Sequence, residues 1–469
     1  MQIVWLRRDL RVEDNSALHQ AIDSGQPVVA VFIATPETWA KHHLAPIQAD
    51  LIYRRLFELQ HDLAKLNIPL LYHQVADFTE SVDWLCDAAS ELQASRILFN
   101  KEYEWNESQR DQYLCERAKC DVASYDDKCL FAPGSVFNKQ GDYFKVFTPF
   151  KKHYLAKLEQ YPATIAKSHR VEERAELGAM SAYLLSADSE FSYPRASSEG
   201  YCVDTRSIRQ RLRDFCQDDV DGYQQQRDFP AVEGTSRLSP YLAIGALSVR
   251  QCTARLMIGH GYHLSLGRQT WLSELIWRDF YQHLVFFEPK LSKGKNFVGW
   301  TEKVEWLENH DYLSAWQQGR TGYPIVDAAM RQLNATGWMH NRLRMIVASF
   351  LTKDLHIHWH EGEKYFMQQL IDGDYAANNG GWQWSASTGC DGQPYFRIFN
   401  PITQGEKFDA QGAFIRTWIP ELESVPDKFI HKPWLWDNVN TLSYPQPIVD
   451  HKSERALTLR FFQNAKDSL

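Results

Sequence analysis

The first 130 residues alternate short apolar runs with longer amphipathic segments, and this alternation limits the fold more than any other feature. Strands separated by helices form a parallel sheet, whose right-handed crossovers place helices on both faces. We therefore predict a doubly wound α/β domain over residues 1–130. The expected strands are 3–6, 28–33, 70–73, 97–100 and 121–125, and the expected helices are 16–23, 47–66, 81–92 and 107–118.

The pattern becomes almost purely helical after residue 200. Helical spacing is found at 207–217, 248–257, 270–286 and 323–336, and in a segment that begins near Trp338. Residues 201–469 are therefore predicted to form an all-α domain. Residues 131–200 become rich in Ala, Ser, Glu and Pro after residue 160, which predicts a long interdomain linker with one ordered turn or helix near 145–154.

Composition excludes several classes of protein. No run is apolar over the roughly 18 residues that a membrane span needs, and the N-terminus lacks a signal-peptide core. The eight cysteines include no Cys-x-x-Cys pair, which favours reduced thiols over disulfides or a zinc site and gives no candidate metal ligands. These features predict a cytoplasmic protein.

Charge is distributed unevenly along the chain, whose net charge is -8. Residues 1–200 hold 22 Lys and Arg against 29 Asp and Glu, and the rest holds 29 against 30. Neither part is basic, so any DNA binding must depend on a local patch.

The segment from Trp338 to Trp384 concentrates aromatic and polar residues. Its opening half is predicted to be a helix that places Asn341, Arg344 and Met345 on one face. Polar groups on a face that packs into the core need partners. An aromatic core explains any one of these residues, whereas the whole cluster favours a site for a flat organic ligand.

The first predicted strand leads into Arg7-Arg8-Asp9, without a Gly-x-Gly-x-x-Gly fingerprint. The segment 100–107, NKEYEWNE, follows the fourth strand, and ligands bind at the carboxyl ends of strands in doubly wound sheets. This segment is either an ordinary helix start or a pocket for a second small molecule.

The segment 233–241, EGTSRLSPY, combines Thr235, Ser236 and Ser239 with Arg237 before a helix that starts with proline. Hydroxyls and backbone N–H groups at a helix start favour an anion, so the segment is a candidate phosphate cradle. An ordinary helix N-cap explains it as well.

Two further segments leave their function open. Glu274, with Trp277 and Arg278 one turn later, is either a ligand-binding acid or half of an ordinary ion pair. In the segment 395–407, Arg397, Gln404 and Lys407 lie among aromatic residues and either contact a phosphate backbone or are solvated charges.

Taken together, these motifs resemble those of the photolyase/cryptochrome flavoprotein family. The resemblance extends from WLRRDLRVEDN through EGTSRLSPYL, WLSELIWRDFY, TGYPIVDAAMRQL and GWMHNRLRM to DGDYAANNGGWQWSASTG. It implies a C-terminal helical domain that binds FAD non-covalently, and an antenna chromophore near the α/β domain.

The implied FAD contacts are Tyr223, Thr235, Ser236, Arg237, Leu238, Ser239, Trp271, Arg278, Asn341, Arg344, Asp372, Asp374 and Asn378. Within this set, Arg344 and Asp372 resemble an ion pair beside the isoalloxazine ring. Asn378 matches the position that faces the flavin N5.

The pocket residues resemble those of photolyases that act on cyclobutane pyrimidine dimers. The (6-4) photolyases would carry histidines at Asn341 and Met345, and plant cryptochromes typically carry Asp at Asn378. The implied DNA contacts are Arg227, Glu274, Trp277, Asn341, Arg342, Met345, Trp384, Arg397, Gln404 and Lys407. The resemblance thus implies a monomeric enzyme that binds damaged DNA.

The implied reaction transfers an electron from light-excited, reduced FAD to the dimer, whose ring splits before the electron returns. Glu274 and Asn378 are the expected catalytic residues, and Trp382, Trp359 and Trp306 match an electron-transfer chain that reduces the flavin. Core packing is the competing explanation for each tryptophan. A flavin-based blue-light receptor without repair activity is the alternative function.

The antenna is expected to be 5,10-methenyltetrahydrofolate rather than a deazaflavin. Folate-using relatives resemble this chain at His42, Asn106, Glu107 and Lys293, although His43 and Ser292 depart from them.

Overall fold

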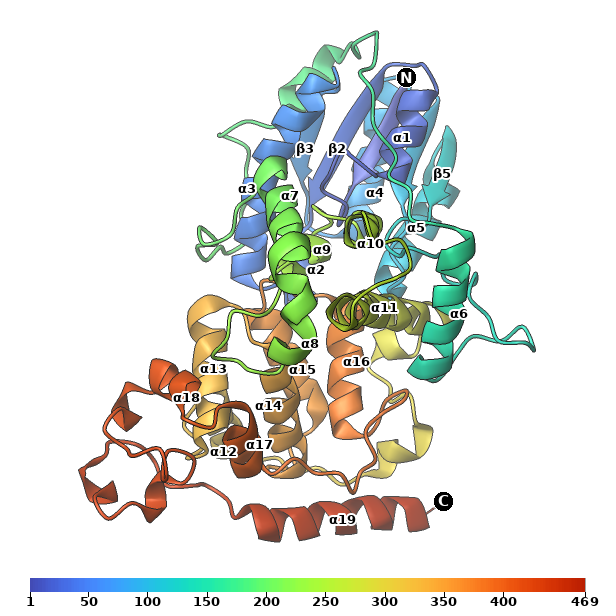
Figure 1. Ribbon diagram of the computed structural model, residues 1–469. Coiled ribbons are helices and arrows are strands. Elements are labelled where there is room, and N and C mark those ends of the chain that lie inside the picture. The colour runs from blue at the N-terminus through green and yellow to red at the C-terminus, as the bar shows by residue number, and fades with distance from the viewer. Residues whose placement is uncertain (469) are drawn as a thin grey trace. The chain divides into compact units, whose positions relative to one another are not determined.

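Five parallel strands form one sheet in the order β3-β2-β1-β4-β5 (Figure 1). The strands are β1 (Gln2–Leu6), β2 (Val28–Ala34), β3 (Leu70–Gln74), β4 (Arg96–Asn100) and β5 (Asp121–Tyr125). Every residue of β1 and β2 is buried, as expected for central strands with helices on both faces. The predicted doubly wound sheet is confirmed, and each predicted strand lies within one residue of its position.

The computed structural model describes residues 1–468 and divides into two units. Residues 1–221, 236–292 and 372–374 make up the first unit, which contains the sheet. Its helices are α1 (Ser16–Asp23), α2 (Pro36–Lys41), α3 (Pro46–Lys65), α4 (Phe78–Glu91), α5 (Trp105–Arg117), α6 (Phe147–Gln160), α7 (Thr205–Asp214), α9 (Ser239–Ala243), α10 (Val249–Met257) and α11 (Leu266–Phe287).

The segment predicted as a linker is anchored within the first unit. It contains α6 and a 3-10 helix at Gly178–Tyr183. The Arg54 guanidinium donates to the Ser198 carbonyl oxygen at 2.6 Å, and the buried Arg55 donates to the Val203 carbonyl oxygen at 2.8 Å. These two bonds fix residues 198–203 to α3.

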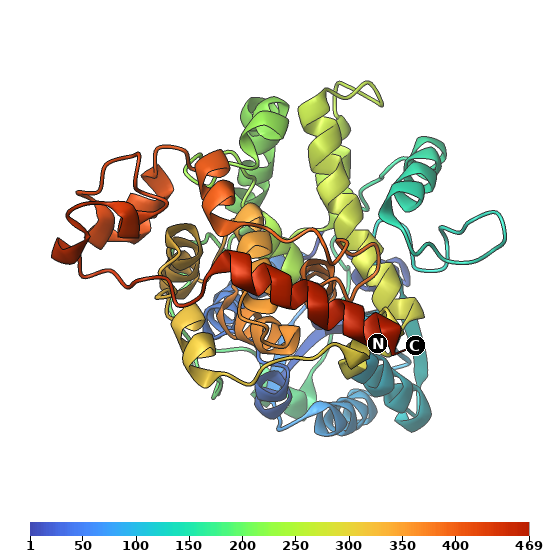
Figure 2. The same cartoon turned by 90° about the horizontal axis from the view of Figure 1, so that it is seen from below.

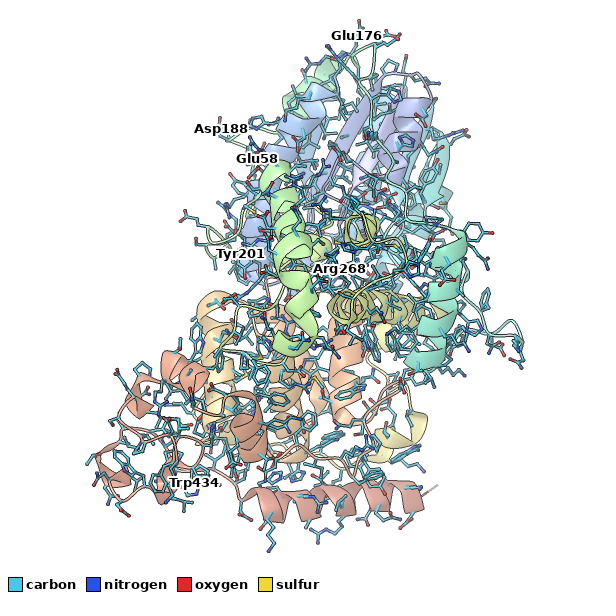
Figure 3. All side chains as sticks on the ribbon, in the orientation of Figure 1. Glu58, Glu176, Asp188, Tyr201, Arg268 and Trp434 are labelled. Atoms are coloured by element: carbon cyan, nitrogen blue, oxygen red, sulfur yellow. The ribbon has the colours of Figure 1, made fainter. Side chains whose placement is uncertain are left out.

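Helix α11 also belongs to the first unit, and a buried arginine near its start connects it to its neighbours. Arg268, labelled in Figure 3, donates to the carbonyl oxygens of Cys216 at 2.7 Å and Leu256 at 3.0 Å. Since both oxygens lie at the ends of helical segments, the guanidinium satisfies carbonyl groups that would otherwise be unpaired.

The second unit comprises residues 222–235, 293–371 and 375–469, and its described part contains helices and loops but no strand. Its helices are α8 (Tyr223–Gln226), α12 (His310–Gln317), α13 (Pro324–Thr336), α14 (Asn341–Lys353), α15 (Trp359–Gln369), α16 (Tyr375–Ala386), α17 (Pro401–Phe408), α18 (Ala413–Trp418) and α19 (His451–Asp467). Helices α13 to α16 enclose an apolar core. Figure 2 shows α19, in red, crossing this unit, and it contacts α14.

Candidate functional site

The three tryptophans predicted to carry electrons all lie in the second unit, at different depths. Trp382 is 2% exposed and Trp359 is 0% exposed, whereas Trp306 is only partly buried. The Trp382 ring meets the rings of Phe366 at 5.0 Å and Trp316 at 6.0 Å, both edge-on. The Trp359 indole N–H donates to the Asn296 side-chain oxygen at 3.0 Å. The indoles thus extend from the core of this unit to its surface.

Gly362 provides the space in which the Trp382 ring packs. A Cβ added to Gly362 would lie 2.0 Å from Cη2 of Trp382 and 2.4 Å from Cζ3. Gly362 is three residues after Trp359 on α15, so one helix carries one predicted electron carrier and supports the next.

Replacing Gly362 with alanine is expected to destabilise the protein by about 1–3 kcal/mol, because overpacking a buried ring forces side chains and backbone to shift. Gly299→Ala is the matched control, since nothing lies within 4 Å of a Cβ at Gly299. Chemical denaturation of both variants measures the difference. Equal unfolding free energies would contradict the packing role of Gly362.

Asn378, on α16, is held by the neighbouring helix α15. Its Nδ2 donates to the Glu363 backbone oxygen at 2.9 Å, so its Oδ1 is the atom left to meet a ligand. The adjacent Asn379 donates to Glu363 Oε1 at 2.7 Å. Burial raises the pKa of Glu363 to about 7, even though this hydrogen bond favours the carboxylate. No pattern along the chain indicated a role for Glu363.

Replacing Glu363 with glutamine is expected to change how stability depends on pH. The folded-state pKa of Glu363 lies above its ordinary value of 4.5, so its contribution is complete at low pH and is lost as the pH rises through about 7. The variant lacks this titration. Its free energy of unfolding, relative to that of wild type, should therefore be higher at pH 8 than at pH 5 by up to about 3 kcal/mol. Thermal midpoints across this range test the sign. A difference that is constant with pH would contradict it.

Four predicted FAD contacts form hydrogen bonds within the first unit. Ser239 Oγ donates to Asp372 Oδ2 at 2.6 Å. Asp374 accepts from Gln282 Nε2 at 3.1 Å, and Arg278 donates to the Lys128 backbone oxygen at 2.7 Å. Arg278 also lies 3.1 Å from the carboxylate of the adjacent Asp279.

The remaining predicted FAD contacts are divided between the two units. In the first unit Arg237 has a left-handed backbone with φ of 52°, and Trp271 and Leu238 are buried. In the second, Arg344 Nε donates to the Met339 backbone oxygen at 2.8 Å. The predicted Arg344–Asp372 pair stays a prediction. The others named from the sequence are Tyr223, Thr235, Ser236 and Asn341.

Three of the cations predicted to contact DNA gather in the second unit around Phe408 and Asp228. Arg342 donates to Asp228 Oδ1 at 2.9 Å, and Arg227 lies 3.8 Å from the same oxygen. The Arg342 guanidinium and the Lys407 ammonium lie 4.6 and 5.0 Å from the Phe408 ring centroid. These cations form a local basic cluster, which we call the Phe408 patch.

Trp277, a predicted substrate contact, is supported by a residue that the sequence did not indicate. Its ring stacks on Phe147 of α6, with ring centroids 3.6 Å apart and planes 8° from parallel. Phe280 packs edge-on to the same indole at 5.7 Å. The Trp277 side chain is nevertheless only partly buried, so the stack holds an aromatic surface that a base can contact.

The other predicted DNA contacts in the second unit lie on three helices and one loop. Met345 and Asn341 are on α14, Trp384 is on α16, and Gln404 is on α17. Arg397 lies in the loop before α17, where its backbone N–H donates to the Pro394 oxygen at 2.9 Å.

Three of the four predicted antenna residues meet in the first unit. Asn106 Nδ2 lies 2.9 Å from His42 Nε2, and Glu107 Oε1 lies 3.5 Å from His42 Nδ1. Burial, and next the positive charge of Arg8, lower the pKa of His42 to about 4. Burial, and next the negative charges of Glu104 and Glu102, raise the pKa of Glu107 to about 7. Lys293, the fourth residue, belongs to the second unit.

His42 and Glu107 line a cavity that is open to solvent. Its walls combine aromatic rings with arginines, and they include Trp5, Phe32, Trp39, Phe78, Arg7, Arg8 and Arg110. Aromatic walls with a few charged groups are typical of small-molecule sites. The segment 100–107 is a helix start, since α5 begins at Trp105, and α5 also contributes residues to this cavity.

Two parts of the chain match models of known protein families. Residues 2–169 match the family model described as DNA photolyase, and residues 271–464 match the FAD binding domain of DNA photolyase. The chain is 57% identical to the deoxyribodipyrimidine photo-lyase of Vibrio cholerae, over 99% of this chain and 100% of that protein. The chain belongs to the DNA photolyase family. The Escherichia coli deoxyribodipyrimidine photo-lyase is 50% identical over 99% of this chain and 98% of its own length.

Solved structures of photolyases have the same fold. A class III photolyase from Agrobacterium tumefaciens superposes with a TM-score of 0.84 at 33% identity, covering 99% of this chain and 98% of that one. Membership of the photolyase family confirms the fold class and the FAD-binding domain that the motifs implied. Among residues 1–468, no helix has the length and apolar character of a membrane span.

Proposed function

We propose that this protein is a deoxyribodipyrimidine photo-lyase that uses FAD and light to split cyclobutane pyrimidine dimers in DNA. The observation that carries the proposal is the composition of α14 to α16. These helices hold three predicted FAD contacts, the Trp359 and Trp382 indoles, and predicted lesion contacts. Close relatives named for this activity support it.

The residues fit a flavin. Trp382 Nε1 is buried without a hydrogen-bond partner among the described residues, and the Asn378 amide presents an oriented carbonyl oxygen. Hydroxyls at Thr235, Ser236 and Ser239 suit a pyrophosphate. Bound FAD, once reduced and excited by near-ultraviolet or blue light, supplies the electron that opens the dimer and takes it back.

The protein places the lesion and stabilises its negative charge. The dimer leaves the base stack, which damage makes less costly. Trp277 and Trp384 pack on its faces, and Met345 fills the apolar side. Glu274 accepts a hydrogen bond from a pyrimidine. The Phe408 patch binds flanking phosphates, which replace Asp228 as the partner of Arg342, while Arg397 and Gln404 extend the contact with the backbone.

The test is direct. The purified protein, loaded with FAD and chemically reduced, is illuminated with an oligonucleotide that carries a thymine dimer, and restored thymine is measured by chromatography against a dark control. Light-dependent recovery of thymine is the expected result. A reduced, FAD-loaded preparation that restores none would overturn the proposal.

Replacing Glu274 with alanine is expected to lower the repair yield per absorbed photon while FAD content and DNA affinity are retained. Glu274 favours the dimer radical anion by sharing a proton with the pyrimidine, and a hydrogen bond to a charged group contributes about 1.5–3 kcal/mol, so its loss weakens the stabilisation of that anion against electron return. Quantum yield on a defined oligonucleotide measures the effect. An unchanged yield would exclude this role.

We also propose that a reduced folate, 5,10-methenyltetrahydrofolate, serves as the antenna and contacts His42, Asn106 and Glu107. The neutral His42 imidazole and the Glu107 carboxyl supply hydrogen-bonding groups beside an aromatic cavity. Absorption and mass spectra of the released chromophore distinguish a folate from a deazaflavin. Glu107→Ala should lower the ratio of chromophore to FAD, and a deazaflavin in the extract would overturn the assignment.

A further inference from the structure

Three histidines alternate with other residues around Trp359, in the segment HIHWH at 356–360. The His358 ring packs against two of the predicted electron-carrying indoles. Its centroid is 5.2 Å from that of Trp306, edge-on, and 5.8 Å from that of Trp359, stacked at 27°. One imidazole therefore packs against both indoles, within the second unit alone.

His358 is also held in place by its own backbone neighbourhood. It is the N-cap of α15, and its Nδ1 accepts a hydrogen bond from the His360 backbone N–H at 3.2 Å. Accepting this bond requires a lone pair on Nδ1, so the imidazole is neutral with its proton on Nε2. Burial, and next the neighbouring His360, lower the pKa of His358 to about 4, although the negative charge of Glu302 acts to raise it.

Trp306 is fixed against this ring by the backbone. The Leu307 N–H donates to the His356 carbonyl oxygen at 2.7 Å. Asn296 ties the other end of the segment 296–307. Its side-chain oxygen accepts from the Trp359 indole N–H, and its backbone N–H donates to Glu302 at 2.7 Å. The contact between Trp306 and His358 is therefore built into the fold of this unit.

We propose that His358 is a positioning residue for electron transfer, whose neutral ring joins the Trp359 and Trp306 indoles into one packed path. This inference rests on the proposed function. An electron passes from Trp382 to the photo-excited flavin, then from Trp359 to oxidised Trp382, then from Trp306 to oxidised Trp359. The oxidised Trp306 releases its N–H proton to water and is reduced by an external thiol.

The charge state of His358 matters because the migrating species is a radical cation. A neighbouring imidazolium would raise the energy of an oxidised indole through like-charge repulsion, which is strong where burial limits screening. The N-cap bond, by occupying Nδ1, prevents this. The ring also replaces a solvent gap with packed atoms, and electron tunnelling is faster through packed atoms than across a gap.

The experiment separates the ring of His358 from its capping role. His358→Asn keeps an N-cap acceptor but removes the ring, and His358→Phe keeps a ring but removes the cap. His340→Asn is the matched control, because His340 caps α14 with the same geometry, its Nδ1 accepting from the Arg342 N–H at 3.2 Å. Each FAD-loaded protein is illuminated with a thiol donor, and flavin reduction and the tryptophan radical are followed by absorption.

His358→Asn should slow photoreduction roughly tenfold, which corresponds to a barrier higher by about 1.4 kcal/mol. His358→Phe should restore most of the rate while lowering the thermal midpoint, and His340→Asn should photoreduce like wild type. Photoreduction of His358→Asn at the wild-type rate, or equal loss in the Asn and Phe variants, would overturn the inference. Repair by chemically reduced protein is measured in parallel, so that failure of the proposed function is seen separately.

Discussion

Trp306→Phe should abolish light-driven reduction of the flavin while leaving repair by chemically reduced protein unchanged. Trp306 is the partly buried member of the three indoles, whereas Trp359 and Trp382 are enclosed. Phenylalanine fills most of the space but is far harder to oxidise, so the oxidised Trp359 has no carrier from which to draw an electron. The electron then returns from the flavin to the oxidised Trp359 before an external thiol can act.

Trp300→Phe is the control for this experiment. Trp300 is also partly buried and packs edge-on to Phe462 at 6.3 Å, in the same unit but without a predicted role. Initial rates of photoreduction under thiol, together with repair of a dimer by dithionite-reduced protein, give the two readings needed. If Trp306→Phe photoreduces at the wild-type rate, Trp306 is not the terminal electron carrier, and the assignment of the three tryptophans as an electron-transfer chain is wrong.

The sheet could be predicted from the sequence because its signal is local. Each strand is a short apolar run bounded by polar residues, and alternation with helices fixes parallel pairing. Helix α2 was missed because six residues beginning with Pro36 carry too little periodicity to detect. The order of the strands, and the meeting of polar groups after β1 and β4, depend on contacts between distant segments: Asn100 Nδ2 donates to Asp9 Oδ2 at 2.6 Å.

Helix α16 shows where local preference misleads. Its sequence includes Asn378-Asn379-Gly380-Gly381, and Asn-Gly steps ordinarily favour turns, while each glycine costs a helix about 1 kcal/mol. Tertiary contacts overcome this preference. Glu363 of α15 binds both asparagines, and Trp382 packs over Gly362. No sequence pattern marked Glu363, because a single glutamate on an amphipathic helix normally faces solvent.

Phe147 was missed for a different reason. It lies in the segment predicted as a linker, and nothing along the chain connects it to Trp277, which is 130 residues away. The composition of residues 160–199 suggested a surface connection, but α6 begins before that region and packs its aromatic side chains on α11. A pairing of this kind becomes visible only in the folded chain.

Trp277→Ala should weaken binding of dimer-containing DNA by about 10- to 100-fold, since stacking of a base on an aromatic side chain contributes about 1–3 kcal/mol. Binding of undamaged DNA should change little, because there the phosphate contacts dominate and the bases stay in the stack. The Phe147 stack supports this expectation, since it holds the indole plane before a lesion arrives and so reduces the ordering cost of binding.

Trp277→Phe is the matched variant, because it keeps an aromatic face against Phe147 and should retain most of the affinity. Dissociation constants for the two oligonucleotides, measured by fluorescence anisotropy at one fixed salt concentration, give the ratio that decides the question. Since Trp277→Ala also removes packing against Phe147 and Phe280, FAD content and thermal midpoint are recorded for each variant. A folded Trp277→Ala protein that loses affinity equally for damaged and undamaged DNA would show that the indole supports the fold and does not contact the lesion. A loss confined to damaged DNA would place Trp277 against the extruded dimer.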